Sequence, residues 1–453
     1  MTTFQRLLGA TLIVACAVGC SQWRAARTAD RRARAEPAAP RTAESDDAAD
    51  DEPQSRGFDP DDASPLVAEA PAESREFTYV RVFYGTDRAP ETDVDPRREP
   101  NEYYSGVPGD LDYGFCDVSI PVSHEYGEVE RPRIWRFEFE ERPDQHVVLQ
   151  SITPANENAF LLALQDDVDE SESGEAFIFV HGYNVTFAEA ARRTAQIAYD
   201  LEFDGPPIFY SWPSRGNLVG YTADSTAAAR AQPHLLDFIT AVARDSGARR
   251  IHLIAHSMGN QIVTGVLGRL AEQDGENIPK FNEVILAAPD IDAITFKQDI
   301  APRITDVVDR VTVYASDDDQ ALRASETLHR ATRLGQGGKD LTVLPNISAI
   351  DMIDTSALEF GFFDLGHSAY GDQLLADIRQ VLTGTPASAR GLQPHPRRSP
   401  AWRLKSAASG TRLVSHSEVE DESETGDAEP TRPVTESLWS RWWGRAMALW
   451  PWE

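Results

Sequence analysis

A serine stands between an apolar run and a helical pattern in the segment "LIAHSMGNQIVTGVL", which runs from Leu253 to Leu267. The residues before Ser257 favour a buried strand, and the apolar residues after it recur at helical spacing. Such a sharp strand-to-helix turn can hold a serine hydroxyl up at the helix N-terminus, where Gly259 leaves room for a close crossing. The pattern predicts nucleophilic attack by Ser257 on an acyl carbon; the alternative is a helix cap without chemistry.

A serine hydroxyl is a poor nucleophile without a base, and the base needs a carboxylate to orient it. If the order along the chain is Ser, Asp, His, the histidine must come late. His367, in "FFDLGHSAY", lies in a loop after the last strand region and just before the final helix, so it is the candidate base. His329 falls within a helical pattern, whereas His395 and His416 fall in a segment expected to be disordered.

The acid has more than one candidate. Three consecutive aspartates, residues 317–319, follow the strand pattern "RVTVYAS". We favour Asp319, because it directly precedes the helix signal "QAL". Asp290 and Asp292 follow the preceding strand pattern and are the alternatives.

Strand and helix patterns alternate from Gly174 onward, which positions these residues. Helices are expected near 187–203, 222–246, 260–273 and 371–382, the first with a capping box of Thr186 and Glu189. This order predicts an α/β protein, with a mostly parallel sheet covered by helices on both faces. Upstream, "FTYVRVFYGTDRAP", "GFCDVSIPV" and "RIWRFEFEE" predict a β-rich, antiparallel N-terminal segment.

Six motifs occur in order between Phe77 and Leu382: "FYGTDR", "FVHGYNVTF", "YSWPS", "AHSMGN", "YASDDDQAL" and "GHSAY". On these motifs the chain resembles the α/β-hydrolase superfamily, and in particular a poorly characterised bacterial esterase/lipase-like family. The resemblance implies the α/β-hydrolase fold and a triad of Ser257, Asp319 and His367. It also implies an oxyanion hole formed by the backbone N–H groups of Tyr183 and Met258.

The resemblance further implies a serine hydrolase that cleaves an ester-type bond of an acyl substrate through an acyl-enzyme. The alternative is a non-catalytic envelope lipoprotein that uses the hydrolase fold for binding or scaffolding. No set of His, Cys, Asp and Glu has metal-ligand spacing, and no glycine-rich phosphate loop occurs, so neither a metal nor another cofactor is expected. A net charge of −30 argues against a nucleic-acid partner.

The N-terminus predicts export. Arg6 precedes an apolar run that is too short for an ordinary membrane span and suits a signal peptide. The run ends in "AVGC", which resembles a bacterial lipobox whose cysteine, here Cys20, is lipidated; an ordinary secretory signal is the alternative. By the same resemblance, Ser21 after the cysteine favours the outer membrane of a bacterial envelope.

Composition divides the rest of the chain. We expect a signal peptide over 1–20, a disordered linker over 21–76, the hydrolase domain over 77–384 and a disordered acidic segment over 385–435. Residues 436–453 hold five of the nine tryptophans at helical spacing beside two arginines. This tail is expected to lie in a membrane interface or to dock on its own domain.

Overall fold

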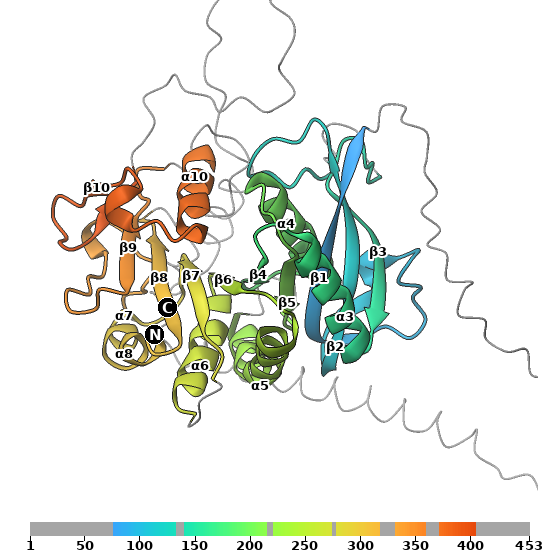
Figure 1. The fold of residues 1–453 in the computed structure, drawn as a ribbon, viewed down its shortest axis with the longest axis horizontal. Coiled ribbons are helices and arrows are strands. Elements are labelled where there is room, and N and C mark those ends of the chain that lie inside the picture. Colours follow the sequence, from blue (N-terminus) through green and yellow to red (C-terminus); the bar gives the residue numbers. More distant parts are fainter. Residues whose placement is uncertain are drawn as a thin grey trace, which may run out of the picture. The chain divides into compact units, whose positions relative to one another are not determined.

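A single mixed sheet organises the computed structural model, which describes residues 76–132, 140–214, 221–273, 278–317, 331–358 and 371–404. All of these residues belong to one unit, residues 72–453. The strand order across the sheet is β10-β11-β9-β8-β7-β6-β4-β5-β1-β2-β3 (Figure 1). Pairing is parallel from β11 through β9, β8, β7, β6, β4 and β5 to β1, so the predicted mostly parallel sheet is confirmed.

The N-terminal strands form the antiparallel part of the sheet. They are β1 (Phe77–Pro90), β2 (Tyr104–Pro121) and β3 (Val148–Ala155), with the short helix α2 (Pro100–Tyr103) between the first two. The predicted strand in "FTYVRVFYGTDRAP" corresponds to β1, and the one in "GFCDVSIPV" falls in β2. Most of the third, "RIWRFEFEE", lies outside the described residues. β1 also pairs in parallel with β5, which joins this segment to the central sheet.

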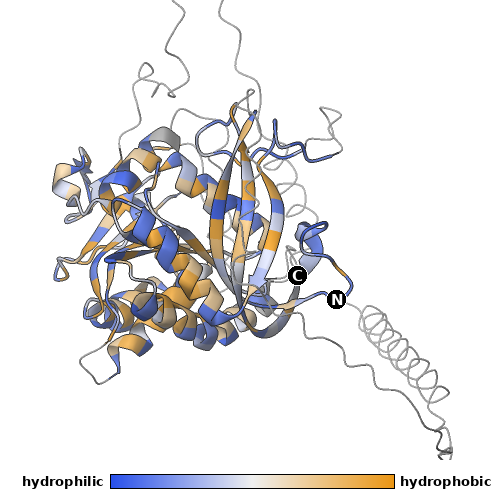
Figure 2. Cartoon of the chain, turned by 45° about the vertical axis from the view of Figure 1, so that its right-hand side comes forward, coloured by the Kyte–Doolittle hydropathy of each residue, from blue (hydrophilic) through white to orange (hydrophobic). Residues whose placement is uncertain are grey.

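The central strands are β4 (Glu175–Val180), β5 (Pro207–Ser211), β6 (Arg250–His256), β7 (Phe281–Ala287), β8 (Val308–Ala315) and β9 (Ile350–Asp354). Successive side chains on a strand point to opposite faces, and β4 illustrates the result. Ile178 and Val180 enter one hydrophobic cluster, whereas Phe177 and Phe179 enter the other. Figure 2 shows hydrophobic residues, in orange, both on the strands and on the helices beside them. The sheet therefore has a hydrophobic core on each face.

Helices cover both cores. The longer ones are α3 (Glu157–Glu170), α4 (Phe187–Asp200), α5 (Tyr221–Asp245), α6 (Gly259–Ala271) and α10 (Gly371–Leu382), and α7 (Ala293–Thr295), η4 (Phe296–Ile300) and α8 (Ala301–Ile304) are short. Residues of α3, α5 and α6 enter the first cluster, and residues of α4 and α10 enter the second. The predicted capping box of Thr186 and Glu189 is present at the start of α4.

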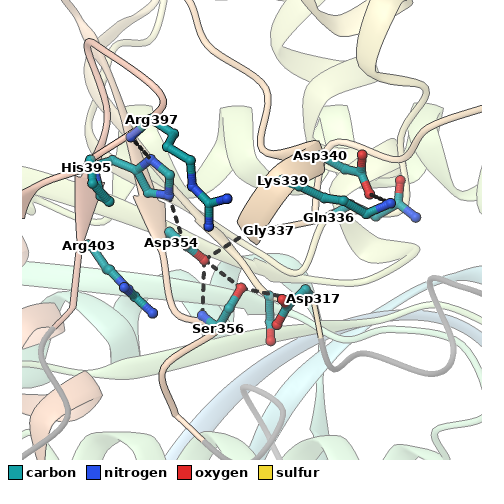
Figure 3. Close-up of a pocket in the computed structure, with 13 residues that line it drawn as sticks. Asp317, Gln336, Gly337, Lys339, Asp340, Asp354, Ser356, His395, Arg397 and Arg403 are labelled. Carbon is teal, nitrogen blue, oxygen red and sulfur yellow. Dashed lines mark hydrogen bonds and ion pairs between the residues drawn. The ribbon is translucent and has the colours of Figure 1, made fainter.

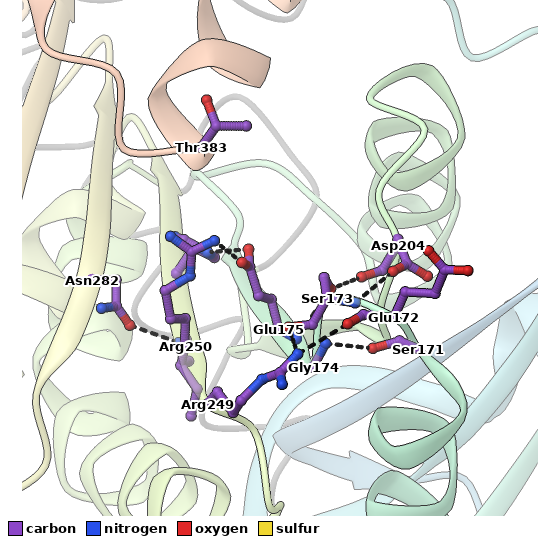
Figure 4. Close-up of polar contacts among 12 residues, drawn as sticks. Ser171, Glu172, Ser173, Gly174, Glu175, Asp204, Arg249, Arg250, Asn282 and Thr383 are labelled. Atoms are coloured by element: carbon purple, nitrogen blue, oxygen red, sulfur yellow. Dashed lines mark hydrogen bonds and ion pairs between the residues drawn. The ribbon is translucent and has the colours of Figure 1, made fainter.

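Hydrogen bonds and ion pairs connect the segments at the amino ends of β4 and β6 (Figure 4). Arg250 pairs with Glu175 across the start of these strands, and the Arg249 guanidinium donates to the Glu172 carbonyl at 2.9 Å. The Asn282 side chain accepts from the backbone of Ile251 at 3.1 Å. These contacts stabilise the amino ends of the strands, whereas ligands of open α/β sheets bind beyond the carboxyl ends.

The folded domain continues past the predicted boundary at residue 384. The 3₁₀ turn η6 (Ala387–Ala389) and the two-residue strands β10 (Gln393–Pro394) and β11 (Trp402–Arg403) form this extension, and β11 pairs in parallel with β9; the other 3₁₀ turn, η5 (Gly338–Asp340), lies before the boundary. Ala401 and Leu404 are buried beside this strand, so residues 385–404 are not a disordered segment as predicted. The polar composition hid this extension, because two-residue strands show no periodicity.

The predicted signal peptide, residues 21–75 of the predicted linker, residues 405–435 and the tryptophan-rich tail lie outside the described residues. Within the described part of the chain, no helix has both the length and the apolar character needed to cross a membrane.

Candidate active site

Ser257 occupies the turn between β6 and α6, where its backbone φ is +48°. A residue other than glycine in this left-handed region costs on the order of 1–3 kcal/mol and persists only where its surroundings enforce it. Hydrogen bonds enforce it here: the Ser257 N–H donates to Ala287 at 3.0 Å, and its carbonyl accepts from Asn260 at 3.2 Å and Asp290 at 3.3 Å. This is the backbone of a nucleophile elbow.

Two glycines bring the 181–186 loop, which follows β4, against this elbow. A Cβ atom on Gly182 would lie 3.0 Å from the Ser257 Cβ, and one on Gly259 would lie 2.5 Å from the His181 carbonyl oxygen. Only residues without a side chain allow backbones to approach this closely. The structure therefore brings together Ser257 and the two segments that carry the predicted oxyanion donors, Tyr183 and Met258.

Trp212 holds the base of the 181–186 loop. Its indole N–H donates to the His181 carbonyl at 2.8 Å, and its ring stacks on the His181 imidazole with centroids 5.2 Å apart. The tryptophan is fully buried. It therefore packs and orients the loop.

His256, next to Ser257, is not poised for proton transfer near neutral pH. Desolvation by burial and the charge of Arg193 lower the pKa of its imidazole to about 3. The ring is therefore neutral under ordinary conditions, and it is a weak base.

The predicted base and acid, His367 and Asp319, lie outside the described residues. Their places in the chain are nevertheless defined by the elements around them. Asp319 follows the last residue of β8, Ala315, by four positions, and His367 falls between β9 and α10. Because β6, β8 and β9 run parallel, the segments that follow them begin at the same edge of the sheet as Ser257.

The two alternative acids already have structural partners. Asp290 is buried and forms an ion pair with Arg333, with Nε and Oδ1 2.7 Å apart. The Asp292 carboxylate caps α7 by accepting from the backbone N–H of Thr295 at 2.7 Å. Each carboxylate thus stabilises the β7–α7 connection.

A polar cavity of about 560 Å³ lies at the carboxyl ends of β8 and β9 (Figure 3). Within it, the His395 imidazole lies 3.0 Å from the Asp354 carboxylate, which also accepts from the Ser356 backbone at 3.0 Å and from that of Gly338 at 3.2 Å. Other lining side chains come from Asp317, Lys339, Asp340, Arg397 and Arg403. The prediction that His395 lies in a disordered segment is wrong. Its contact with Asp354 joins residues far apart in the sequence, so no local pattern indicates it.

Over the described ranges, no group of three or more His, Cys, Asp or Glu side chains is placed to hold a metal ion.

The mixed sheet, the helices on both faces and the strained serine after a central parallel strand define an α/β-hydrolase fold. A family model described as an alpha/beta hydrolase of unknown function (DUF900) matches residues 156–383, half of the chain. The chain belongs to this family.

Individual relatives are more distant. An uncharacterized protein, alr1448, of Nostoc sp. (strain PCC 7120) is 33% identical over 66 residues, which cover 15% of this chain and 17% of that protein. A fungal esterase from Rhizomucor miehei is 14% identical with a TM-score of 0.30, covering 69% of this chain and 83% of its own. Esterase 2 of Thermogutta terrifontis is 15% identical with a TM-score of 0.24, covering 47% and 85%.

Proposed function

We propose that this protein is a serine hydrolase that cleaves a carboxylic ester-type bond through an acyl-enzyme. The observation that carries the proposal is the left-handed backbone of Ser257, with φ +48°, on a turn that lies against Gly182. A helix cap has no need of this strain, whereas a nucleophile held up at a sharp turn does.

In the proposed mechanism, the Ser257 hydroxyl attacks the acyl carbon while His367 takes its proton. The backbone N–H groups of Tyr183 and Met258 stabilise the negative oxygen of the tetrahedral intermediate. His367 then returns the proton to the leaving alcohol, and the acyl group remains on Ser257. Water, activated by the same histidine, releases the acid and restores the serine.

Asp319 is the proposed partner of His367. It would orient the imidazole and stabilise its protonated form. The two alternative acids support this choice, because a triad acid must be available to the histidine. The Asp290 carboxylate is already paired with Arg333, and the Asp292 carboxylate already caps the start of α7.

The test is covalent labelling with a fluorophosphonate, which reacts with activated serines. Full-length wild type should be labelled, and Ser257→Ala should not. Ser246→Ala removes another buried serine hydroxyl at the end of α5 and is the matched control that should keep its labelling. A folded wild-type protein that stays unlabelled, or labelling that persists in Ser257→Ala, would refute the proposal.

We also propose that the protein acts in a bacterial cell envelope, with the outer membrane favoured, attached through lipid on Cys20 and through its tryptophan-rich tail. The support is the sequence alone: a signal-like run that ends in a lipobox-like cysteine, and a C-terminal segment with aromatic and basic residues at helical spacing. The acyl-ester substrate is then one that occurs in or beside that envelope.

A further inference from the structure

Arg88, near the end of β1, is buried beside the 181–186 loop, and the hydrogen bonds of its guanidinium to described residues all go to neutral oxygens. It donates from Nε to the Ser211 hydroxyl at 2.8 Å and from Nη2 to the Val185 carbonyl at 2.7 Å. Nη1 donates to the carbonyls of Ser214 at 3.0 Å and Ser105 at 3.2 Å. A buried cation is costly unless its donors are satisfied, and here neutral oxygens of β2, of the end of β5 and of the loop accept from each nitrogen of the guanidinium.

Ser211 connects this guanidinium to His181. The His181 Nδ1 atom lies 2.8 Å from the Gly182 carbonyl oxygen, which can only accept, so Nδ1 carries the ring proton. Nε2 of the neutral ring is therefore an acceptor, and the Ser211 hydroxyl, 3.1 Å away, donates to it. Burial, together with the charge of Arg88, lowers the pKa of His181 well below its usual value, which keeps the ring neutral.

The hydrogen bond from His181 Nδ1 to the Gly182 carbonyl also constrains the next group in the chain, the Tyr183 N–H. The Gly182 C=O and the Tyr183 N–H belong to one planar trans peptide, so they point in opposite directions. Fixing the carbonyl on His181 fixes the direction of the Tyr183 N–H. This peptide begins at Gly182, the residue that lies against Ser257.

We propose that Arg88 is a positioning residue that, through Ser211 and His181, sets the orientation of the Gly182–Tyr183 peptide beside Ser257. The inference rests on the proposed function, because the orientation of this peptide matters for catalysis only if the Tyr183 N–H is an oxyanion donor. Arg88 lies outside residues 156–383, which the family model matches, so the N-terminal β segment completes the site from outside that region.

The hydrogen-bond relay is tested without any turnover. Two-bond ¹H–¹⁵N spectra of histidine-labelled full-length protein distinguish protonated from unprotonated ring nitrogens, and His181→Gln assigns the signal. We expect a proton on Nδ1 of His181 in the wild type. In Ser211→Ala, the Nε2 resonance of His181 should move while that of His124, which contacts the last residue of α4, stays in place. A proton on Nε2 in the wild type, or an unmoved resonance in Ser211→Ala, overturns the relay whether or not the protein hydrolyses esters.

The catalytic consequence is tested with p-nitrophenyl butyrate. Removing an oxyanion donor costs roughly a hundredfold to a thousandfold in kcat, and a misaligned donor should cost less, about tenfold to a hundredfold in Ser211→Ala. KM should stay within about twofold, because the loss falls on the transition state. Ser119→Ala, which removes an equally buried hydroxyl on β2, is the matched control and should retain wild-type kinetics.

Arg88→Lys should recover part of the kcat lost in Arg88→Met, since lysine keeps the charge but cannot span Ser211, Val185 and Ser214 together. If Arg88→Met does not fold, Ser211→Ala still tests the relay, because it leaves the other bonds of Arg88 intact. Equal kcat values for Ser211→Ala and Ser119→Ala overturn the positioning role. A wild type without hydrolysis but with the expected His181 spectrum refutes the proposed function and leaves the relay standing.

Discussion

At the scale of single residues, the base gives the sharpest prediction. His367→Gln should lower kcat by about a thousandfold or more, because Ser257 would lose its proton acceptor. Circular dichroism and the melting temperature should stay at wild-type values, since His367 is predicted from the sequence to lie in a loop and to contribute little to the core. His256→Gln is the matched control: His256 is next to the proposed nucleophile, but the low pKa of its imidazole makes it a poor base. Near-normal turnover in purified His367→Gln would mean that another histidine acts.

The acid is the second residue-scale prediction. Asp319→Asn should reduce kcat far more than Asp317→Asn or Asp318→Asn, because only the carboxylate that orients His367 stabilises the imidazolium. Asp290→Asn should instead lower the melting temperature, since it breaks the buried pair with Arg333. Were Asp290→Asn or Asp292→Asn to abolish turnover in a protein of normal stability, the acid would follow β7.

Among single residues, those whose role depends on neighbours in the sequence could be predicted, and those whose partners are distant in the sequence could not. The turn at Ser257 could be predicted because a strand, a small-residue turn and a helix are contiguous in "LIAHSMGNQIV". Arg88 could not, because its partners Val185 and Ser211 are 97 and 123 positions away along the chain. His395 was missed for the same reason, as it meets Asp354 from 41 positions away.

At the scale of elements, a buried histidine ties the β2–β3 connection to the end of α4. His124 lies between two carboxylates, with Nδ1 2.9 Å from Glu130 and Nε2 2.8 Å from Asp200. Burial would lower the pKa of His124, but the two carboxylates outweigh burial and raise it to about 9. The protonated imidazole therefore carries an ionic link between two separate elements.

This link predicts a loss of stability on the alkaline side. The folded-state pKa lies above the unfolded value of about 6.5, so the stabilisation is complete below about pH 6.5 and is lost as pH rises through 9. The free energy of unfolding, measured in urea, should fall by up to about 3 kcal/mol from this group. His124→Gln should flatten that decline, and the neighbouring Ser123→Ala, which removes no titrating group, should preserve it. An identical slope in His124→Gln would contradict the assignment.

Most central elements were predictable because each carries its own period or apolar run, as in α5 and in β6 to β8. The order of strands across the sheet was not, since it depends on pairings between distant segments. β1 illustrates this: its sequence indicates an antiparallel hairpin strand, yet it also pairs in parallel with β5 and so delivers Arg88 to the site. β10 and β11 are too short for any period, and their place is set by pairing with β9 and by the buried Ala401 and Leu404.

At the scale of the whole molecule, the described domain is flanked by two segments for which attachment to a membrane is proposed. A single lipid chain gives only weak, reversible binding, and a second contact makes attachment firm. The tail from Glu436 to Glu453 offers such a contact, because its tryptophans and leucines recur at spacings of three and four with Arg441 and Arg445 between them. A helix this short is marginal in water and should order only on a surface.

The two attachments can be separated in one experiment on full-length protein from a lipoprotein-processing host. Binding to anionic vesicles should be strongest for the wild type, weaker for Cys20→Ala and for deletion of residues 436–453, and weakest for the two changes combined.

Labelling with a fatty-acid analogue should be lost only where Cys20 is replaced, and Cys116→Ala is its matched control, since Cys116 is buried in the domain. Hydrolysis of a small soluble ester should be unchanged throughout, because neither change removes a residue of the proposed catalytic site. Vesicle binding that survives the deletion, together with a lower melting temperature, would show that the tail packs on its own domain, and equal labelling of Cys20→Ala would exclude that cysteine as the acceptor.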